Sequence, residues 1–269
     1  MTWRFWVCLV LSVALAAAAL LVFGVSLWTV LFALTMLACP AVMVWSYFTG
    51  VRPLPVPLGP VPETRGMTLN WMAPFYDRLA QRLGVGPPFR ARTLAFARLR
   101  SGERVLDVGC GTGVLTRLAA KAVAPHGHAV GIDPAPDMIR VALANSAEVR
   151  PIVDFKVAAI EDLPFPDANF DAAFASFMIH HLPPDLKQTG LREVHRVLKP
   201  GGRFVVVDLD RPADRLWWLL LWPMLFVAST APHLRGQVPS YLRRAGFVSV
   251  ETQARWRGLA TFWTGEKPA

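Results

Sequence analysis

The sequence of 269 residues is long enough for one large domain, or for one medium-sized domain with an appendage. Apolar residues make up 54% of it and charged residues 17%, with a mean hydropathy of +0.37, so part of the chain is expected to lie outside water. The net charge is +9, and the three cysteines show neither a disulfide framework nor metal-ligand spacing, which excludes a disulfide-bonded scaffold and predicts no metal site.

The N-terminal region contains no charged residue between Arg4 and Arg52. A helix needs about 20 apolar residues to cross a bilayer, so this run predicts two spans, near Phe5–Phe23 and Leu27–Phe48. Because basic flanks stay on the cytoplasmic side, we expect a multi-pass protein of the inner membrane whose remaining domain is cytoplasmic. A cleaved signal peptide and a buried core hairpin are the alternatives for residues 1–50.

Residues 51–62 carry a proline at almost every second position. Such a segment cannot be helical and favours polyproline II, a semi-rigid spacer. We therefore expect a proline-rich linker over residues 51–66, followed by one domain over residues 67–269.

The domain begins with a basic, helical pattern. Met72, Phe75, Leu79 and Leu83 recur at helical spacing, which predicts one apolar face. Seven arginines lie on or after it: Arg78, Arg82, Arg90, Arg92, Arg98, Arg100 and Arg104. Next to a membrane anchor, anionic headgroups are the expected partner, whereas the sequence lacks any nucleic-acid motif. A solvated basic face without a partner is the alternative.

Apolar strand-like runs and helical patterns then alternate. The predicted strands are Val105–Val108, Ala129–Ile132, Ile152–Val157, Ala172–Phe177 and Arg203–Asp208. The predicted helices are Gly113–Ala124, Ala135–Asn145 and Lys187–Leu198. This order predicts an α/β fold with a doubly wound, mostly parallel sheet, whose ligand crevice lies at the carboxyl ends of the strands.

A glycine-rich loop, Asp107–Gly113, joins the first strand to a helix. Small residues let a ligand lie against the main chain, and the helix N-terminus suits a carboxylate. Asp133 ends the next strand, roughly 20 residues on, where it can accept hydrogen bonds from both ribose hydroxyls of a nucleoside. The Gly-x-Gly-x-Gly spacing and the acidic Asp107 argue against a dinucleotide, because an anion suits an ammonium better than a pyrophosphate.

A further acidic pair, Glu161 and Asp162, follows the third predicted strand. The Asp162 carboxylate can accept a hydrogen bond from an adenine amino group. Each acid alone could be a capping or surface carboxylate. Acids at successive strand ends instead predict a nucleoside-binding site.

The chain resembles the class I S-adenosylmethionine-dependent methyltransferases, of the branch that includes ubiquinone and menaquinone biosynthesis methyltransferases. The resemblance runs from Phe75 to the C-terminus. It is carried by Phe75–Asp77, Arg104–Gly113, Val130–Asp133 with Met138, Glu161–Pro166, Phe170–Asp171, His180–Leu182, Glu193–Gly202 and Tyr241–Phe247. It implies a seven-stranded Rossmann-like sheet ending in a hairpin, here Val248–Glu251 and Leu259–Thr264, and S-adenosyl-L-methionine as cofactor.

The resemblance also implies roles for individual residues. Gly109 and Gly111 would pass the methionine moiety, and Asp107 would hold its amine. Asp133 would hold the ribose, Met138 would pack on adenine, and Asp162 with Leu163 would contact the adenine edge. Ser176 and Phe177 would flank the transferring methyl group. The expected cofactor-binding set also contains Cys110, Thr112, Gly113, Pro134 and Glu161.

Four residues are candidates for catalysis, because a general base is needed only if the acceptor loses a proton. His180, His181 and Asp208 follow the fourth and fifth predicted strands, and Tyr76 lies on the segment expected to cover the crevice. A histidine pair that merely holds the loop is the favoured alternative.

The segment Leu216–Ser229 is almost unbroken in its apolar character and departs from the family pattern. It is too short to span a bilayer, and Pro223 should kink it. A membrane-dipping element, the wall of a lipid-sized pocket and a buried core helix are the three interpretations.

We therefore expect a membrane-anchored methyltransferase that acts on a lipophilic acceptor: a quinone precursor, an isoprenoid or a phospholipid headgroup. A methyltransferase for a soluble metabolite or protein would require Leu216–Ser229 to be buried. A non-catalytic cofactor-binding membrane component and a nicotinamide enzyme are further alternatives. The sequence leaves the oligomeric state undetermined.

Overall fold

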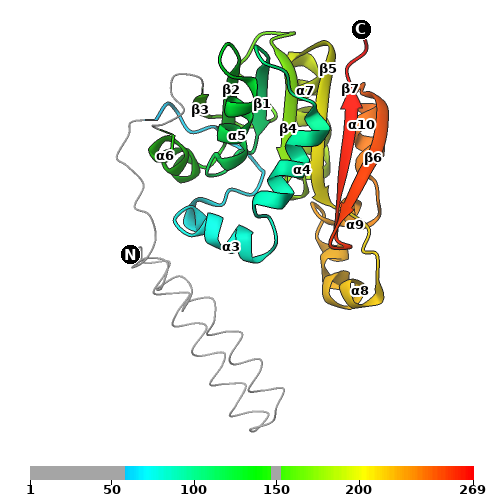
Figure 1. Ribbon diagram of the computed structural model, residues 1–269. Coiled ribbons are helices and arrows are strands. Elements are labelled where there is room, and N and C mark those ends of the chain that lie inside the picture. The colour runs from blue at the N-terminus through cyan, green and yellow to red at the C-terminus, as the bar shows by residue number, and fades with distance from the viewer. Residues whose placement is uncertain (1–57, 147–152) are drawn as a thin grey trace. The chain divides into compact units, whose positions relative to one another are not determined.

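The computed structural model describes residues 58–146 and 153–269, and a seven-stranded sheet runs through them. The strands are β1 (Arg104–Val108), β2 (His128–Asp133), β3 (Val153–Val157), β4 (Phe170–Ser176), β5 (Leu198–Leu209), β6 (Val248–Trp256) and β7 (Ala260–Glu266). Their spatial order is β3-β2-β1-β4-β5-β7-β6 (Figure 1).

The sheet is mixed. Strands β1 to β5 are parallel, with Leu106 opposite Val130 on one side and Ala173 on the other. Strand β7 runs antiparallel to both β5 and β6, so the two last strands form the expected hairpin. The seven-stranded Rossmann-like sheet is thus confirmed, and its parallel part accounts for the alternation of strand and helix in the sequence.

Helices cover both faces of the sheet. On one face α4 (Pro87–Ala97) and α5 (Val114–Val123) pack on side chains such as Val105, and on the other α7 (Pro184–Val197) and α10 (Val238–Arg244) pack on side chains such as Leu106. Alternate residues of the buried strands serve opposite faces, which is why these strands are apolar throughout. The remaining helical elements are η1 (Asn70–Met72), α3 (Tyr76–Arg82), α6 (Pro136–Ala144), η3 (Ile179–His181), α8 (Arg215–Leu221), η4 (Trp222–Phe226) and α9 (Ala231–Leu234).

The predicted apolar face of the first helical stretch is only partly correct. Phe75 is buried, but Leu83 is 66% exposed, because α3 ends at Arg82 and the chain turns at Gly84 with a φ of +92°. The basic run also divides, since Arg90 is buried whereas Arg78 is exposed. For Arg90, both the expected contact with anionic headgroups and the alternative of a solvated basic face were therefore wrong.

The two predicted membrane spans, within residues 1–50, lie outside the described residues. Among residues 58–146 and 153–269, no helix is long and apolar enough to cross a membrane.

The segment after β5 is an exposed element. Helix α8 ends at Leu221, just before Pro223, and the chain continues as the short 3-10 helix η4. Leu219, Trp222 and Phe226 are 70%, 53% and 81% exposed. The interpretation of this segment as a buried core helix was therefore wrong.

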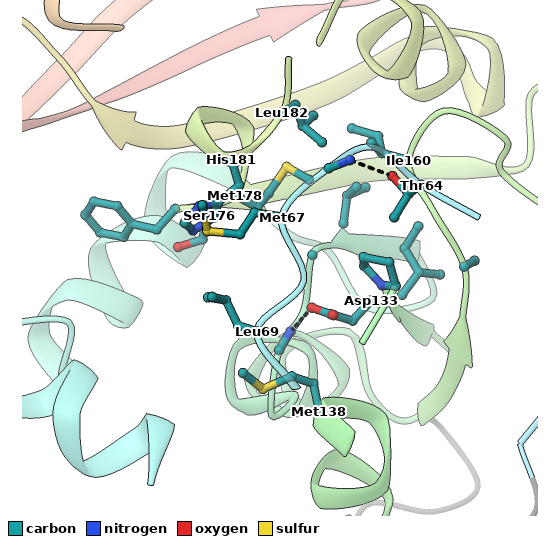
Figure 2. A pocket seen from close by; sticks show the side chains of 18 of the residues that line it. Thr64, Met67, Leu69, Asp133, Met138, Ile160, Ser176, Met178, His181 and Leu182 are labelled. Carbon is teal, nitrogen blue, oxygen red and sulfur yellow. Dashed lines mark hydrogen bonds between the residues drawn. The ribbon is translucent and has the colours of Figure 1, made fainter. Parts of the chain in front are cut away.

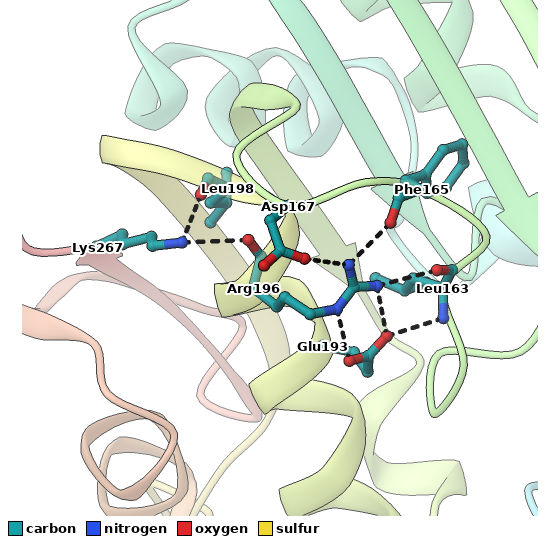
Figure 3. A network of polar contacts seen from close by, with 7 residues as sticks. All are labelled: Leu163, Phe165, Asp167, Glu193, Arg196, Leu198 and Lys267. Atoms are coloured by element: carbon teal, nitrogen blue, oxygen red, sulfur yellow. Dashed lines mark hydrogen bonds and ion pairs between the residues drawn. The ribbon is translucent and has the colours of Figure 1, made fainter.

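A network around Arg196 holds the loop between β3 and β4 against α7 (Figure 3). The Arg196 guanidinium donates to the carbonyl oxygens of Leu163 at 3.0 Å and Phe165 at 2.8 Å, and it pairs with the carboxylates of Glu193 and Asp167. The Glu193 carboxylate in turn accepts a hydrogen bond from the Leu163 backbone at 3.1 Å. One side chain thus fixes the loop that carries Glu161 and Asp162.

We predict that Arg196→Met lowers the free energy of unfolding by about 1–3 kcal/mol, because two partly buried carbonyl groups lose their donor. Denaturant unfolding followed by circular dichroism measures the change. Arg192→Met is the matched control, since Arg192 is exposed on the same helix and makes no side-chain hydrogen bond or ion pair within the described ranges. Equal stability of the two variants would contradict the assigned role.

Candidate functional site

A cavity of about 660 Å³, partly open to solvent, lies at the edge of the sheet where the parallel strands end (Figure 2). Its residues follow those strand ends directly: Gly109 after β1, Pro134 after β2, Ala158 after β3 and Phe177 after β4. Loops after parallel strands meet at one edge, so residues distant in sequence line one hollow. This is the crevice that the sequence predicts.

The glycine loop forms the floor of the cavity in a conformation that favours glycine. Gly109, Gly111 and Gly113 have φ values of +68°, +53° and +74°. A Cβ on Gly109 would lie 2.7 Å from Met178, and one on Gly113 would lie 2.5 Å from the Phe155 ring. A Cβ on Gly111 would have no neighbour closer than 3.7 Å. Gly113 therefore serves packing, whereas Gly111 leaves room for a ligand against the backbone.

Asp133 ties this loop to the end of β2. Its carboxylate accepts hydrogen bonds from the backbone N–H groups of Gly111 at 3.0 Å and Ala135 at 2.9 Å. Burial raises the pKa of Asp133 to about 6. Each carboxylate oxygen keeps accepting capacity, and the residue lines the cavity, so it can still accept hydrogen bonds from two hydroxyl groups.

The loop after β3 contributes Glu161 to the cavity. Its Oε1 accepts a hydrogen bond from the Thr64 hydroxyl at 2.5 Å, and its Oε2 is buried without a partner among the described residues. Asp162 is exposed and Leu163 is buried in the core, and neither lines the cavity. The predicted contact of Asp162 and Leu163 with adenine stays a prediction, but the placement favours Glu161.

A smaller cavity of about 440 Å³ adjoins the first, because both are lined by Tyr76, Gly109, Gly111 and Ser176. Asp107, Cys110 and Thr112 line this second space, together with Arg90. The sequence predicts all three as cofactor-binding residues, whereas it predicts contact with anionic headgroups for Arg90.

Buried charge characterises this smaller cavity. Asp107 accepts a hydrogen bond from the Thr116 hydroxyl at 2.6 Å, and burial raises the pKa of Asp107 to about 6. Burial also raises the pKa of the Cys110 thiol well above its usual value, so the thiol stays neutral. The Arg90 guanidinium lies 3.8 Å from Asp77, which accepts a hydrogen bond from Thr112. One cation and one buried carboxyl thus face the same space.

The opposite wall of the larger cavity comes from the segment after β4. Ser176, Phe177, Met178 and His181 line it, and Figure 2 shows Ser176, Met178 and His181 close together. Phe177 has a φ of +52°, a conformation that a residue of its size rarely adopts. The Phe177 N–H donates to Val207 at 2.8 Å, which holds the turn against β5.

The histidine pair divides into a buried anchor and a cavity residue. The backbone N–H of His180 donates to Asp208 at 3.1 Å, and His180 Nδ1 lies 2.6 Å from Asp208 Oδ1. Asp208 is fully buried, and neither it nor His180 lines the larger cavity. His181 does line it, with its ring centroid 3.9 Å from that of His180. The loop-holding role suits His180, and His181 and Tyr76 remain the catalytic candidates.

Titratable groups are packed behind His181. Burial lowers the pKa of His181 to about 4 and that of His233 to about 4, and it lowers the pKa of Lys187 to about 8. Burial alone would raise the pKa of Asp208. The combined effect of the neighbouring His180 and His233 is larger, so the pKa of Asp208 lies below its usual value. At neutral pH His181 therefore faces the cavity as an uncharged imidazole that can accept a proton.

The larger cavity is covered by a segment that the sequence does not predict, residues 64–69, which we call the strap. The cavity is lined by Thr64, Gly66, Met67 and Leu69, of which the first two lie in the predicted linker. The Met67 N–H donates to the His181 carbonyl at 3.2 Å, which closes the strap onto the opposite wall. No periodic pattern marks this segment, because it is an irregular chain held by contacts from distant loops.

The residues present fit S-adenosylmethionine. The unpartnered Oε2 of Glu161 and the accepting capacity of Asp133 suit donors on the adenosine moiety, with Met138 beside them. Asp107 and Arg90 in the adjoining space offer opposite charges to an amine and a carboxylate. Space at Gly111 admits a ligand between the two groups.

Comparisons with known proteins identify the family of the chain. A family model described as a methyltransferase domain matches residues 105–202. A demethylmenaquinone methyltransferase from Symbiobacterium thermophilum is 29% identical in an alignment 222 positions long, and the match covers 71% of this chain and 88% of that protein. A ubiquinone/menaquinone biosynthesis C-methyltransferase from Geobacter sp. is 37% identical in an alignment 220 positions long, and the match covers 73% of this chain and 93% of that protein.

One solved structure extends the comparison to the fold. A SAM-dependent methyltransferase from Aquifex aeolicus is similar with a TM-score of 0.55 at 20% identity, and the match covers 71% of this chain and 97% of that chain. At this identity the likeness concerns the fold alone.

We predict that Glu161→Gln weakens S-adenosylmethionine binding about tenfold or more, because a charged acceptor in the cavity becomes a neutral amide. Asp162→Asn is the matched control and should leave the dissociation constant unchanged, since Asp162 is exposed. Isothermal titration calorimetry measures both. A larger loss for Asp162→Asn would instead support the assignment made from the sequence.

We also predict a pH dependence of binding. Asp107 and Asp133 have pKa values raised to about 6, so both are ionised above pH 6 and become protonated below it. A cationic ligand favours the ionised carboxylates, so the affinity should reach its maximum near pH 7.5. Between pH 6 and pH 5 the affinity should fall by up to about tenfold per pH unit for each carboxylate that becomes protonated. Asp107→Asn should flatten this dependence, and a wild-type affinity independent of pH would contradict it.

Proposed function

Since the chain belongs to the class I S-adenosylmethionine-dependent methyltransferases, we propose that it methylates a lipophilic acceptor of the quinone-precursor type at the cytoplasmic face of a membrane. The relative that is 37% identical along 93% of its length carries this proposal, because it is named as a C-methyltransferase of ubiquinone and menaquinone biosynthesis. The demethylmenaquinone methyltransferase at 29% identity supports the same class of acceptor.

The lining of the larger cavity supports an apolar acceptor. Its cofactor side carries the polar groups of Asp133 and Glu161, whereas Met67, Met178 and Leu182 contribute apolar side chains (Figure 2). An aromatic ring would fit against such side chains once the strap excludes water. The exposure of α8 argues against the soluble-substrate alternative, which required that segment to be buried.

The cofactor, when bound, supplies a methyl group on a positively charged sulfur. Around it the chain aligns the reacting atoms and excludes water. Transfer to a quinol ring carbon would form a carbon–carbon bond in place of the sulfur–methyl bond, and the electron pair of the broken bond would stay on sulfur. The hydroxyl of the quinol gives its proton to neutral His181, which returns it to solvent. The hydrogen on the methylated carbon moves to the ring oxygen, so the overall reaction releases one proton.

Tyr76 has a different role in this proposal. Burial, together with Asp133, raises the pKa of Tyr76 to about 12, so its hydroxyl stays protonated at neutral pH. The residue lines both cavities. It therefore acts as a hydrogen-bond donor that orients the acceptor or cofactor, not as a base.

Membrane attachment is part of the proposal. The uncharged residues 5–51 are long enough for two spans, and the basic Arg4 and Arg52 favour a cytoplasmic position for both flanks. This arrangement would keep the methyltransferase domain at the surface where a lipophilic acceptor resides.

The test uses the full chain in nanodiscs with methyl-labelled S-adenosylmethionine. The acceptors are a prenylated naphthoquinol without its ring methyl group, a prenylated benzoquinol, phosphatidylethanolamine and a water-soluble catechol. Label is expected in a prenylated quinol. Label confined to phosphatidylethanolamine or to catechol would reject the proposed acceptor, and no binding of S-adenosylmethionine would reject the function altogether.

We predict that His181→Gln lowers kcat on that quinol by about 10²–10⁴-fold, because the proton acceptor is lost, while the dissociation constant of S-adenosylmethionine changes little. His126→Gln, at an exposed site, is the matched control. Unchanged kcat in His181→Gln would reject His181 as the base.

A further inference from the structure

An apolar surface is built at the cavity edge of the fold from two elements. The side chains of Leu219, Trp222 and Phe226, on α8 and η4, are more than half exposed, and Leu83 at the end of α3 is 66% exposed. Figure 1 shows α3 and α8 at the same edge, towards which the parallel strands run. A single exposed apolar side chain is ordinary on a protein surface, whereas several on adjoining elements mark an interaction surface.

Specific contacts hold the α8 element in place. The Asp214 carboxylate accepts a hydrogen bond from the Trp217 backbone at 3.0 Å and so caps the helix. The Trp217 indole donates to the Arg257 carbonyl at 3.1 Å. Beyond η4, the Ser229 carbonyl accepts a hydrogen bond from the buried Lys187 ammonium. The apolar side chains are therefore displayed by an anchored element.

The two elements are joined through Gly84. The Trp256 indole donates to the Gly84 carbonyl at 3.2 Å, and a Cβ on Gly84 would lie 2.5 Å from the guanidinium carbon of Arg257. Since the backbone carbonyl of the same Arg257 accepts a hydrogen bond from the Trp217 indole, the end of α3 and the start of α8 belong to one continuous surface. We call it the docking face. It consists of Arg78, Arg82, Leu83, Arg215, Leu219, Trp222, Phe226 and Arg257.

The docking face is basic. Its four arginines form no ion pair with any residue of 58–146 or 153–269. The nearby acids are occupied, Asp77 by Thr112 and Arg90, and Asp214 by the helix cap. Tryptophan, phenylalanine and leucine beside arginine make up the composition of elements that lie in the interface of an anionic bilayer.

We propose that the docking face inserts into the headgroup region of a bilayer that contains anionic phospholipids. Charge distinguishes this occupant from two others. A second copy of the chain would bring the same arginines, and residues 1–57 contain two arginines and no acid, so neither can neutralise the face. Anionic headgroups can, and they lie beside the apolar region that Leu219 and Phe226 require.

The docking face is connected to the cavity wall. Lys187 donates to the carbonyl of Leu182 at 2.8 Å as well as to that of Ser229, and Leu182 lines the larger cavity. Insertion of η4 would thus hold the cavity beside the bilayer. This delivery role rests on the proposed acceptor, whereas docking itself does not.

The test labels the full chain in vesicles of phosphatidylglycerol and phosphatidylethanolamine with a trace of phosphatidylglycerol that carries a diazirine on its acyl chain. After irradiation, trypsin releases one peptide over residues 216–235 and a control peptide over residues 245–255, which contains Val248 at 46% exposure. The first peptide is expected to carry about fivefold more lipid label than the second. Equal labelling would overturn the proposal.

Variants test the contributions of apolar and charged side chains separately. Leu219→Asp with Phe226→Asp should abolish the excess label, and the control Val248→Asp should preserve it. Arg78→Gln with Arg82→Gln should reduce it, as should replacing phosphatidylglycerol with phosphatidylcholine. An excess label that survives the double aspartate substitution would overturn the proposal. The melting temperature and S-adenosylmethionine affinity should stay unchanged, since the altered residues are exposed.

Crosslinking distinguishes the other occupants. Crosslinks between the 216–235 peptides of two copies, or from that peptide to residues 1–57, without lipid label would overturn the proposal. Turnover on the prenylated quinol is measured in the same vesicles. Lipid label without turnover supports docking and rejects the proposed acceptor. Turnover without lipid label supports the proposed acceptor and rejects docking.

Discussion

The hydrogen bond between the Asp133 carboxylate and the backbone of Gly111 is the interaction on which the site depends. It joins the loop after β1 to the end of β2, and the second oxygen fixes the start of α6 through Ala135. A loop with successive left-handed glycines has large conformational entropy when free, so a charged tether inside the sheet edge is needed to hold one conformation. The same carboxylate is available to a ligand. One residue thus holds the floor of the cavity and offers accepting capacity to that cavity.

Parts of the fold that depend on local pattern could be predicted from the sequence, and parts that depend on distant contacts could not. The apolar strands and the glycine loop have their own signatures. The structure has β1 to β4 within about two residues of the predicted bounds, whereas β5 begins at Leu198 and not at Arg203. Whether Glu161 or Asp162 enters the cavity depends on the conformation of the irregular turn after β3. Arg196, on α7, holds that turn by a hydrogen bond to the Leu163 carbonyl. Arg90 resembled its basic neighbours in the sequence, and its burial follows only from the packing of α4 beside Asp77.

The two adjacent histidines differ in position, since one supports the loop and the other lines the cavity. His180 is committed to Asp208 by its backbone and its ring, which fixes the short helix η3. His181 is then presented to the cavity beside an anchored ring, and burial keeps it neutral. If His181 is the base, as we propose, its pKa of about 4 gives it little driving force for proton transfer at neutral pH. It suits an acceptor whose own acidity is increased in the site, as that of a quinol hydroxyl near Tyr76 would be.

Burial has different consequences for the carboxyl groups that line the two cavities and for the lysine behind the wall of the larger cavity. Asp107 and Asp133 are carboxyls whose ionisation is opposed by burial, so a cationic ligand that stabilises their charged form changes their protonation most. Lys187 is a cation whose burial is compensated by two carbonyl groups, and the ammonium thereby joins the cavity wall to η4. Because an unpartnered ammonium would be costly there, the segment around Ser229 cannot move away without disturbing the wall at Leu182. The same bond that satisfies a buried charge therefore couples the position of the exposed apolar element to the shape of the cavity.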